Sequence, residues 1–178
     1  MTTTHVHVRR ARETDLPRIS EISRAAYLDG GHLVQDSRYL TVISDAEARM
    51  RGGELFVAEV DGAVAGSVVL ARAEGDFAEL ARPGELEFRV LAVDPAFQGR
   101  GVGRALVRHL LRLAAEDGAE AMVICSMDTM VAAHALYIAE GFVRRPDRDL
   151  VIDGIGRFPT FVHLLRPAAA GAAGRGSD

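Results

Sequence analysis

The stretch LEFRVLAVDPAFQGRGVGRAL, residues 86–106, decides how this chain is expected to fold. It contains an apolar run at residues 90–93 that predicts a strand, and Pro95 ends that strand because proline cannot donate to a sheet ladder. Glycines then alternate at positions 99, 101 and 103, and an amphipathic pattern after them predicts a helix. The free N–H groups and the dipole of a helix N-terminus attract anions, so this segment predicts a phosphate-binding site.

Three kinds of glycine-rich phosphate loop could stand here. A P-loop requires a lysine in GxxxxGK[ST], and the chain contains no lysine. A dinucleotide-binding GxGxxG would place Arg104 or Leu106 at its third glycine, and the following strand ends near Cys125 instead of at an acidic residue. The remaining signature, Q/R-x-x-G-x-G/A, is met by QGRGVG at residues 98–103. With this motif between a strand and a helix, the chain resembles the GNAT superfamily of acyl-CoA-dependent N-acetyltransferases.

Composition indicates a globular protein that works in a reducing environment. The chain has 178 residues, of which 48% are hydrophobic and 26% charged, which suits one domain over residues 1–166. A single cysteine excludes an internal disulfide framework, and the net charge of −4 does not favour nucleic acid. We expect no membrane span and no signal peptide, and therefore a cytoplasmic location. The Ala/Gly-rich tail, residues 167–178, is expected to be disordered.

Hydrophobic periodicity and turn signals predict an α/β chain with the element order β-α-α-β-β-β-α-β-α-β-β. Asp61–Gly62 predicts a hairpin, and loops are expected over residues 29–41 and 146–159. This order matches the GNAT fold, so the resemblance implies a mixed central sheet of six to seven strands with about four helices. The predicted strands are residues 6–8, 55–60, 63–72, 86–93, 121–126, 142–143 and 160–164, and the predicted helices are residues 16–27, 44–51, 102–117 and 129–140.

The resemblance implies a binding site for acetyl-CoA. Backbone N–H groups would hold the pyrophosphate at Gln98, Gly99, Arg100, Gly101, Val102, Gly103 and Arg104. On the preceding strand, the Leu91 N–H would polarise the thioester carbonyl, while Ala92 and Val93 would pair with the pantetheine arm. The side chains of Arg100 and Arg104 either approach the CoA phosphates or belong to a solvated helix face.

Glu87 is the candidate general base. An amine acceptor arrives as ammonium, with a pKa of ~10.4 for a lysine-like group, and must lose a proton before it attacks a thioester. The spacing E-x-x-x-L-A-V, which begins at Glu87, matches the catalytic glutamate of the histone-acetyltransferase branch of the superfamily. The alternative is an ion pair with Arg89, which lies on the same face of the strand.

Tyr137 is the candidate general acid. The segment AHALY, followed by EGF, resembles a second GNAT signature, A-x-x-L-Y-x-x-x-G-F, which implies that the Tyr137 hydroxyl protonates the departing CoA sulfur. The alternative is a core tyrosine. Relatives often carry asparagine seven residues earlier to bind pantetheine, but this chain has Met130 there. The contact would then be lost or move to Ser126 or Thr129.

The resemblance implies an N-acetyltransferase that moves an acetyl group from acetyl-CoA to a small-molecule or peptide amine in a ternary complex. The alternatives are a non-catalytic acyl-CoA sensor on the same fold and a nucleotide-binding oxidoreductase. No metal is expected, because His5 and His7 lack a third ligand. We expect core packing for Cys125, and a homodimer is compatible with the family. Acids in the two predicted loops could attract a cationic amine: Asp29, Asp36, Asp147, Asp149 and Asp153.

Overall fold

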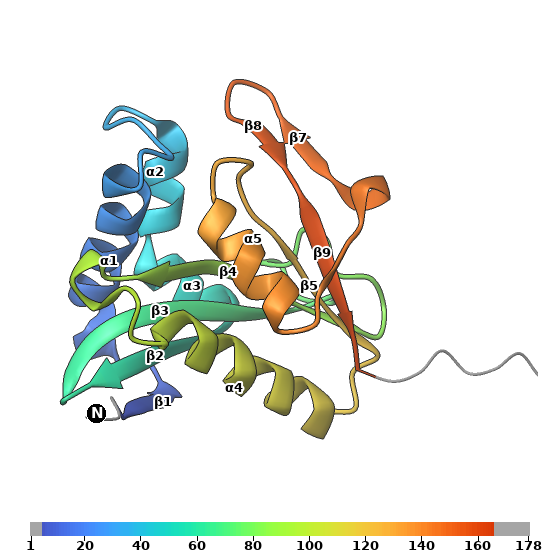
Figure 1. The fold of residues 1–178 in the computed structure, drawn as a ribbon, viewed down its shortest axis with the longest axis horizontal. Coiled ribbons are helices and arrows are strands. Elements are labelled where there is room, and N and C mark those ends of the chain that lie inside the picture. The colour runs from blue at the N-terminus through green and yellow to red at the C-terminus, as the bar shows by residue number, and fades with distance from the viewer. Residues whose placement is uncertain (1–4, 166–178) are drawn as a thin grey trace, which may run out of the picture.

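The computed structural model describes residues 5–165, so the predicted tail lies outside the described part of the chain. Its main sheet has the strand order β1-β2-β3-β4-β5-β9-β6, and β7 and β8 form a separate hairpin (Figure 1). The strands are β1 (Val6–Arg10), β2 (Glu54–Val60), β3 (Ala63–Arg72), β4 (Glu85–Val93), β5 (Ala121–Cys125), β6 (Val143–Arg144), β7 (Leu150–Ile152), β8 (Gly156–Phe158) and β9 (Thr160–Leu164). The helices are α1 (Leu16–Asp29), α2 (Arg38–Ser44), α3 (Ala46–Gly52), α4 (Val102–Glu116) and α5 (Val131–Ala139).

The mixed α/β fold class is confirmed, with seven strands in the main sheet. Only β4 and β5 pair in parallel among the described strands; the other pairs are antiparallel. Two elements differ from the prediction. Helix α2 replaces part of the expected loop over residues 29–41, so the described chain has five α-helices instead of about four. The β7–β8 hairpin occupies the second expected loop.

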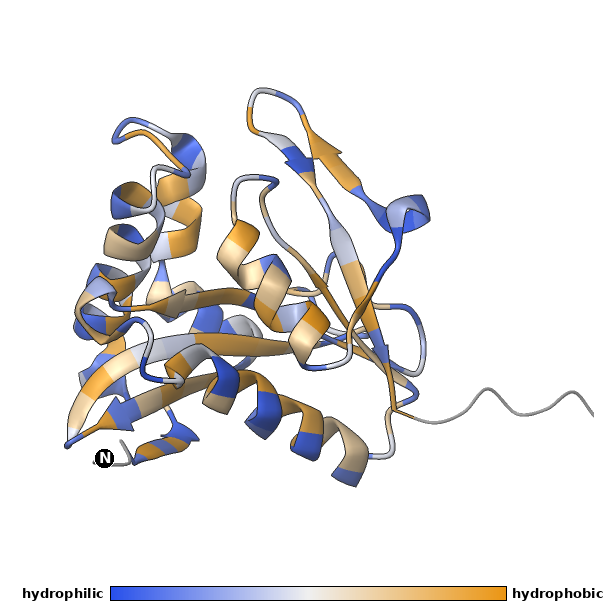
Figure 2. Cartoon of the chain, viewed as in Figure 1, coloured by the Kyte–Doolittle hydropathy of each residue, from blue (hydrophilic) through white to orange (hydrophobic). Residues whose placement is uncertain are grey.

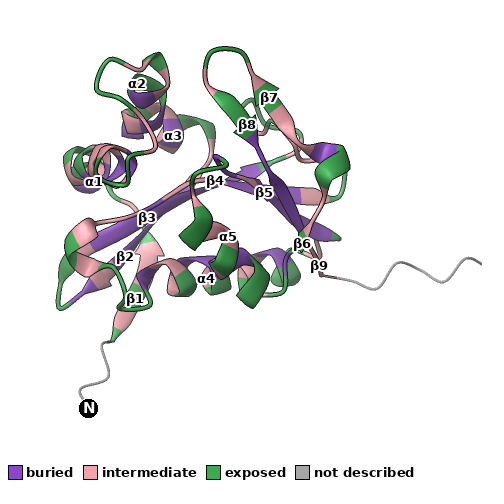
Figure 3. Ribbon diagram, turned by 45° about the horizontal axis from the view of Figure 1, so that its top comes forward, coloured by how far each residue is buried: buried purple, intermediate pink, exposed green. Residues whose placement is uncertain are grey.

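Helices cover both faces of the sheet (Figure 3). On one face, α1 and α3 pack against β2 and β3 through a cluster that includes Ile19, Ala46 and Val57. On the other face lie α4 and α5, and α4 is visibly striped, with one hydrophobic side (Figure 2). That side carries Val102 and Leu106, which are almost fully buried in the largest core cluster. The predicted amphipathic helix therefore fixes the glycine loop at the end of β4.

Strand β4 is irregular where the glycine loop approaches. It pairs with β5 only from Glu85 to Glu87, and beyond that point the two strands separate. Its register with β3 shifts between Ser67 and Val69, which indicates a bulge, and Val90 has a φ of 50°. A β-branched residue with positive φ is strained, and such outliers concentrate at functional sites.

Strand β4 ends as the Asp94–Pro95 pair predicts. The Asp94 side chain accepts a hydrogen bond from the N–H of Ala96 at 2.8 Å, which starts a short 3-10 turn at Pro95–Phe97. Within residues 5–165, no helix combines the length and the apolar character that crossing a membrane requires.

We expect Phe88→Ala to destabilise the fold by about 3–5 kcal/mol, because Phe88 is fully buried and packs edge-on against Tyr137 and Phe142. Equilibrium unfolding in denaturant measures the loss. The control is Val143→Ala, since Val143 is 65% exposed and its loss should change the free energy of unfolding by less than about 0.5 kcal/mol. Equal effects from the two substitutions would contradict this assignment of the core.

Candidate functional site

A cleft runs between the end of β4, the glycine loop and the first residues of α4 and α5; we call it the glycine-loop cleft. Most residues predicted to bind CoA line it: Leu91, Ala92, Val93, Gln98, Gly99, Gly101, Val102, Gly103 and Arg104. Its opposite wall is formed by residues 129–133 with Leu136, and α1 contributes Ala26 and Tyr27. The structure therefore gathers into one concave surface residues that the sequence analysis grouped by motif.

The glycine loop has the shape that an anion cradle requires. Gly99 and Gly101 have φ angles of 76° and 80°, a conformation that side chains disfavour, and no atom lies within 4 Å of where a Cβ would stand on either. Gly101 is the N-cap of α4, so the free N–H groups of the helix begin at this open space. Gly103 serves packing instead, since a Cβ there would meet Leu136 Cδ2 at 3.2 Å.

Two arginines of the motif differ in their placement. Arg104 lines the cleft, and its Nε lies 2.8 Å from Glu140 Oε1 at the end of α5. Arg108 meets the other oxygen of Glu140 at 2.7 Å, so the carboxylate joins the two helices. Arg100 stacks over the Phe97 ring at 5.3 Å and does not line the cleft. Arg104 is thus the cation of this motif that could contact a phosphate at the glycine loop, and its charge is paired with that of Glu140.

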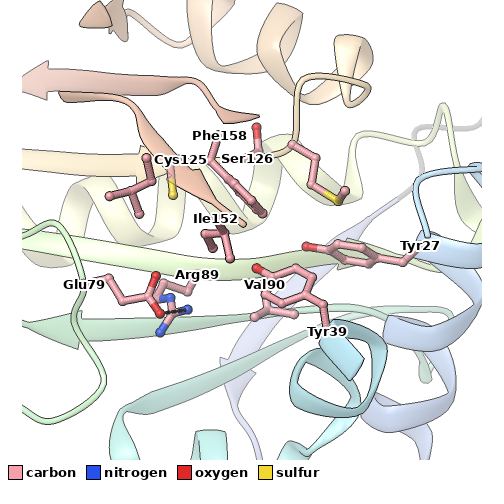
Figure 4. Close-up of a pocket in the computed structure, with 11 residues that line it drawn as sticks. Tyr27, Tyr39, Glu79, Arg89, Val90, Cys125, Ser126, Ile152 and Phe158 are labelled. Carbon is pink, nitrogen blue, oxygen red and sulfur yellow. Dashed lines mark ion pairs between the residues drawn. The ribbon is translucent and has the colours of Figure 1, made fainter. Parts of the chain in front are cut away.

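A second cavity lies on the other side of the gap between β4 and β5; we call it the tyrosine cavity. It is lined by Tyr27, Tyr39, Glu79, Arg89, Val90, Cys125, Ser126, Met127, Leu150, Ile152 and Phe158. Figure 4 shows the hydroxyls of Tyr27 and Tyr39 directed into it, with the Arg89–Glu79 ion pair at one end. Burial raises the pKa of Tyr39 to about 12 and also raises that of Tyr27, so both hydroxyls remain protonated at neutral pH.

The cleft and the cavity meet at the bulge of β4. Val90 lines the tyrosine cavity and the next residue, Leu91, lines the glycine-loop cleft, while Tyr27 borders both. On the β5 side, Ser126 and Met127 face the cavity, and the wall of the cleft begins at Thr129. Two molecules bound in these spaces would approach each other where β4 and β5 separate.

Glu87 lies behind this region and lines neither space. Its side chain is buried, and Oε2 accepts hydrogen bonds from the N–H groups of Glu79, Leu80 and Ala81 at 2.9, 2.7 and 3.1 Å. Its other oxygen, Oε1, is buried without a hydrogen-bond partner among the described residues and lies 3.7 Å from Arg89 Nε. The base role remains a prediction, and these contacts favour a structural role in holding the 79–81 segment.

Tyr137 is buried among three phenylalanine rings, Phe88, Phe142 and Phe161. Burial raises the pKa of its hydroxyl, which keeps the group protonated and available as a donor. Ser126 Oγ is buried without a hydrogen-bond partner among the described residues, yet it is close enough to lower that pKa slightly against the effect of burial. Ser126 lines the tyrosine cavity, and not the cleft as the CoA-binding prediction implied, whereas Tyr137 lines neither space.

Residues 16–142 match the Acetyltransferase (GNAT) family. The chain belongs to this family. N-acetylaspartate synthetase of Danio rerio is 31% identical over 123 residues, which are 67% of this chain and 41% of that protein. N-alpha-acetyltransferase RimI of Mycobacterium tuberculosis is 45% identical over 62 residues, 35% of this chain and 37% of that protein. The chain thus spans less than half the length of these two relatives.

The solved structures of GNAT proteins agree with the fold. A putative acetyltransferase from Salmonella typhimurium, determined with its cofactor acetyl-CoA, superposes with a TM-score of 0.68 at 25% sequence identity. The superposition covers 96% of this chain and 99% of that one. The GNAT resemblance inferred from residues 86–106 is therefore confirmed over nearly the whole chain.

Several residues of the tyrosine cavity escaped the sequence analysis as site residues: Tyr27, Tyr39, Glu79 and Arg89. The two loops expected to face an acceptor do contribute Tyr39, Leu150, Ile152 and Phe158, but not their acids. Asp149, for example, accepts hydrogen bonds from Arg144 at 2.5 and 2.6 Å, so its carboxylate has a structural partner and does not face the cavity. The local sequence of these loops does not distinguish the side chains that line the cavity from the acids that form ion pairs within the fold.

We expect Gly101→Ala to weaken CoA binding about tenfold, because the new methyl group would enter the open space of the glycine loop and strain the N-cap. Titration calorimetry with CoA measures the affinity. Gly62→Ala is the matched control, since Gly62 has the same φ of 80° and equally open surroundings in the β2–β3 turn. Equal CoA affinities for the two variants would exclude the glycine loop as the binding site.

We expect the single thiol, Cys125, to be nearly inert in the native protein. Burial raises its pKa to about 12, so the thiol stays protonated at pH 8. Reaction with a chromogenic disulfide at pH 8 should be slow in buffer and fast in denaturant, with one thiol released per chain. Rapid labelling of the folded protein would show that Cys125 is an activated nucleophile.

Proposed function

We propose that this protein is an acetyl-CoA-dependent N-acetyltransferase that acts by direct attack of an amine in a ternary complex. The observation that carries the proposal is the meeting of the glycine-loop cleft and the tyrosine cavity at Val90 and Leu91. Holding two reactants on either side of one gap converts a bimolecular attack into an oriented reaction. The names of the relatives, an N-acetylaspartate synthetase and an N-alpha-acetyltransferase, support an amine on a small molecule or a peptide as acceptor.

The glycine-loop cleft is the proposed site for acetyl-CoA, which supplies the thioester. Free N–H groups at the start of α4 hold the pyrophosphate, and Gly99 and Gly101 leave its approach open. Arg104 adds a positive charge at the rim, partly neutralised by Glu140. On β4, the backbone beyond Glu87 is not paired with β5 in the described chain, which leaves the edge at Leu91–Val93 for the pantetheine arm.

The bulge gives Leu91 its proposed role. In a regularly paired strand the N–H groups donate to the neighbouring strands, whereas a bulge leaves one residue's N–H group unpaired and changes its direction. We assign the Leu91 N–H to the thioester oxygen, where a fixed donor stabilises the negative charge that develops as the amine attacks. The strained φ of Val90 is the conformational cost of this arrangement.

Proton transfers complete the reaction. The attacking ammonium first loses one proton, the new N–C bond forms, the nitrogen loses a second proton, the C–S bond breaks, and the departing thiolate gains a proton, so that one proton is released overall. We assign the protonation of the thiolate to Tyr137, whose hydroxyl is kept neutral by burial and whose neighbour Ser126 lines the tyrosine cavity. For the first transfer, Glu79 is the only carboxylate that lines the tyrosine cavity among the described residues. Glu79 is therefore the proposed proton acceptor, and Glu87, as a positioning residue, anchors its loop.

We expect Tyr137→Phe to reduce kcat about 100-fold or more while the KM for acetyl-CoA changes little, because only the proton donor is removed. Release of free CoA thiol across a panel of amines measures turnover. The ring contacts with Phe88 and Phe142 persist, so the thermal midpoint should match that of the wild type. Wild-type kcat in this variant would refute the acid role, and a wild-type protein that binds CoA but acetylates no amine would refute the enzymatic proposal.

A further inference from the structure

One end of the tyrosine cavity is charged, and the rest of its wall is apolar except for the two tyrosines, Cys125 and Ser126. Arg89 Nη2 lies 2.8 Å from Glu79 Oε1, and both residues line the cavity. The two side chains differ in environment: Arg89 is 15% exposed, whereas Glu79 is 46% exposed. An ion pair between a largely buried cation and a solvated acid adds little stability, because water screens the charge of the acid. The cavity therefore contains a cation whose partner can be exchanged.

The protein fixes the Arg89 guanidinium without help from Glu79. Its Nη1 donates to the carbonyl oxygen of Phe77 at 2.8 Å, and its Cζ lies over the Phe77 ring, 4.8 Å from the ring centroid. Behind it stands buried Glu87, with Oε1 at 3.7 Å from Nε. Because Glu87 is itself held by three backbone N–H groups, it positions the Arg89 guanidinium from the side that faces away from the cavity. A guanidinium that is oriented before the ligand arrives loses little entropy on binding.

We propose that Arg89 binds a carboxylate of the acceptor, so that the substrate is a free amino acid and not a simple amine. The substrate carboxylate takes the place of Glu79 on Arg89 as a charge-assisted hydrogen-bonded pair. Glu79, released from the arginine, faces the ammonium group of the same substrate. Arg89 and Glu79 thus carry the charges opposite to the carboxylate and the ammonium group of a zwitterionic amino acid. This inference rests on the proposed acetyltransferase function.

The open space inside the cavity is about 20 Å³, which is little more than one water molecule occupies, so a substrate would have to be small and to displace the Glu79 side chain. Leu150, Ile152 and Phe158, from the β7–β8 hairpin, close the cavity opposite β4. Phe158 packs edge-on against Tyr39 at 5.7 Å, which joins the hairpin to α2 across the opening. Apolar walls exclude water from the ion pair that the carboxylate would form, and this exclusion strengthens the pair. A peptide N-terminus has no carboxylate on its first main-chain unit, so it would leave Arg89 paired with Glu79.

The test compares each L-amino acid with its own carboxamide, which keeps the amine and removes only the charge. Rates are expressed per concentration of free amine, because the two amines differ in pKa. We expect wild-type kcat/KM to favour the best acid over its amide by about tenfold or more. Arg89→Gln should abolish this preference through KM for the acceptor while leaving the KM for acetyl-CoA unchanged. The control is Arg145→Gln, which removes an exposed arginine paired with Asp147 outside the cavity and should keep the preference.

A second variant covers the case in which Arg89→Gln does not fold. Glu79→Gln keeps Arg89 and its contacts with Phe77 and Glu87 but removes the competing carboxylate. Turnover should fall with the proton acceptor, so this variant is read by calorimetric binding: the acid and its amide lose the same contact with the ammonium group, whereas only the acid gains a free Arg89, and its binding preference over the amide should rise several-fold. Equal use of acid and amide by the wild type, an undiminished preference in Arg89→Gln, or an unchanged or smaller binding preference in Glu79→Gln would overturn the inference. Preferential use of peptides whose carboxyl group is blocked would do the same.

Failure of the proposed function is distinguishable from failure of this inference. If no amine releases CoA thiol, the acetyltransferase proposal fails, and calorimetric titration of the same acids and amides in the presence of CoA then decides the inference alone. Tighter binding of the acid by the wild type and its loss in Arg89→Gln support a carboxylate site. Equal binding of the acid and the amide refutes it.

Discussion

The parallel pairing of β4 and β5 stops at Glu87 and Val123, and the functional geometry depends on that stop. Neighbouring strands in a continuous sheet lie about 4.8 Å apart, which leaves no room for a ligand between them. Once β4 and β5 separate, the sheet itself has a gap, and each of its two faces can contribute a binding space to that gap. The glycine-loop cleft and the tyrosine cavity are these two spaces, and Val90 and Leu91 stand between them.

Separation of two strands exposes backbone groups, and the fold compensates with elements that cover the gap. On one side, α4 and α5 pack close together, with Gly103 against Leu136 and with Glu140 bridging Arg104 and Arg108. On the other side, α1 and α2 supply Tyr27 and Tyr39, and the β7–β8 hairpin supplies Phe158. The unpaired edges of β4 and β5 lie between these covering elements, where the proposed function places the two substrates.

The parts of the site that sequence analysis could predict are those encoded by neighbours along the chain. The strand, its Asp94–Pro95 end, the glycine loop and helix α4 lie within one stretch, so local patterns were sufficient. Helix α2 was missed because its sequence, RYLTVIS, contains the β-branched Thr41, Val42 and Ile43, which disfavour helix; burial of Leu40 and Ile43 overrides that preference. The β7–β8 hairpin did carry a signal, since Asp153–Gly154 stands between apolar residues, but the surrounding arginines and acids suggested a polar loop.

The tyrosine cavity could not be predicted in the same way, because its polar groups come from α1, α2, the β3–β4 loop, β4 and the end of β5. Glu87 shows how such a site is held together. Its spacing from Leu91 suggested a catalytic base, yet it also lies two residues before Arg89, on the same face of the strand. There its carboxylate binds the backbone of the loop that carries Glu79 and lies beside the guanidinium of Arg89. One buried acid therefore positions both members of the charged pair in the cavity, and it can do so only because it does not itself face the substrate.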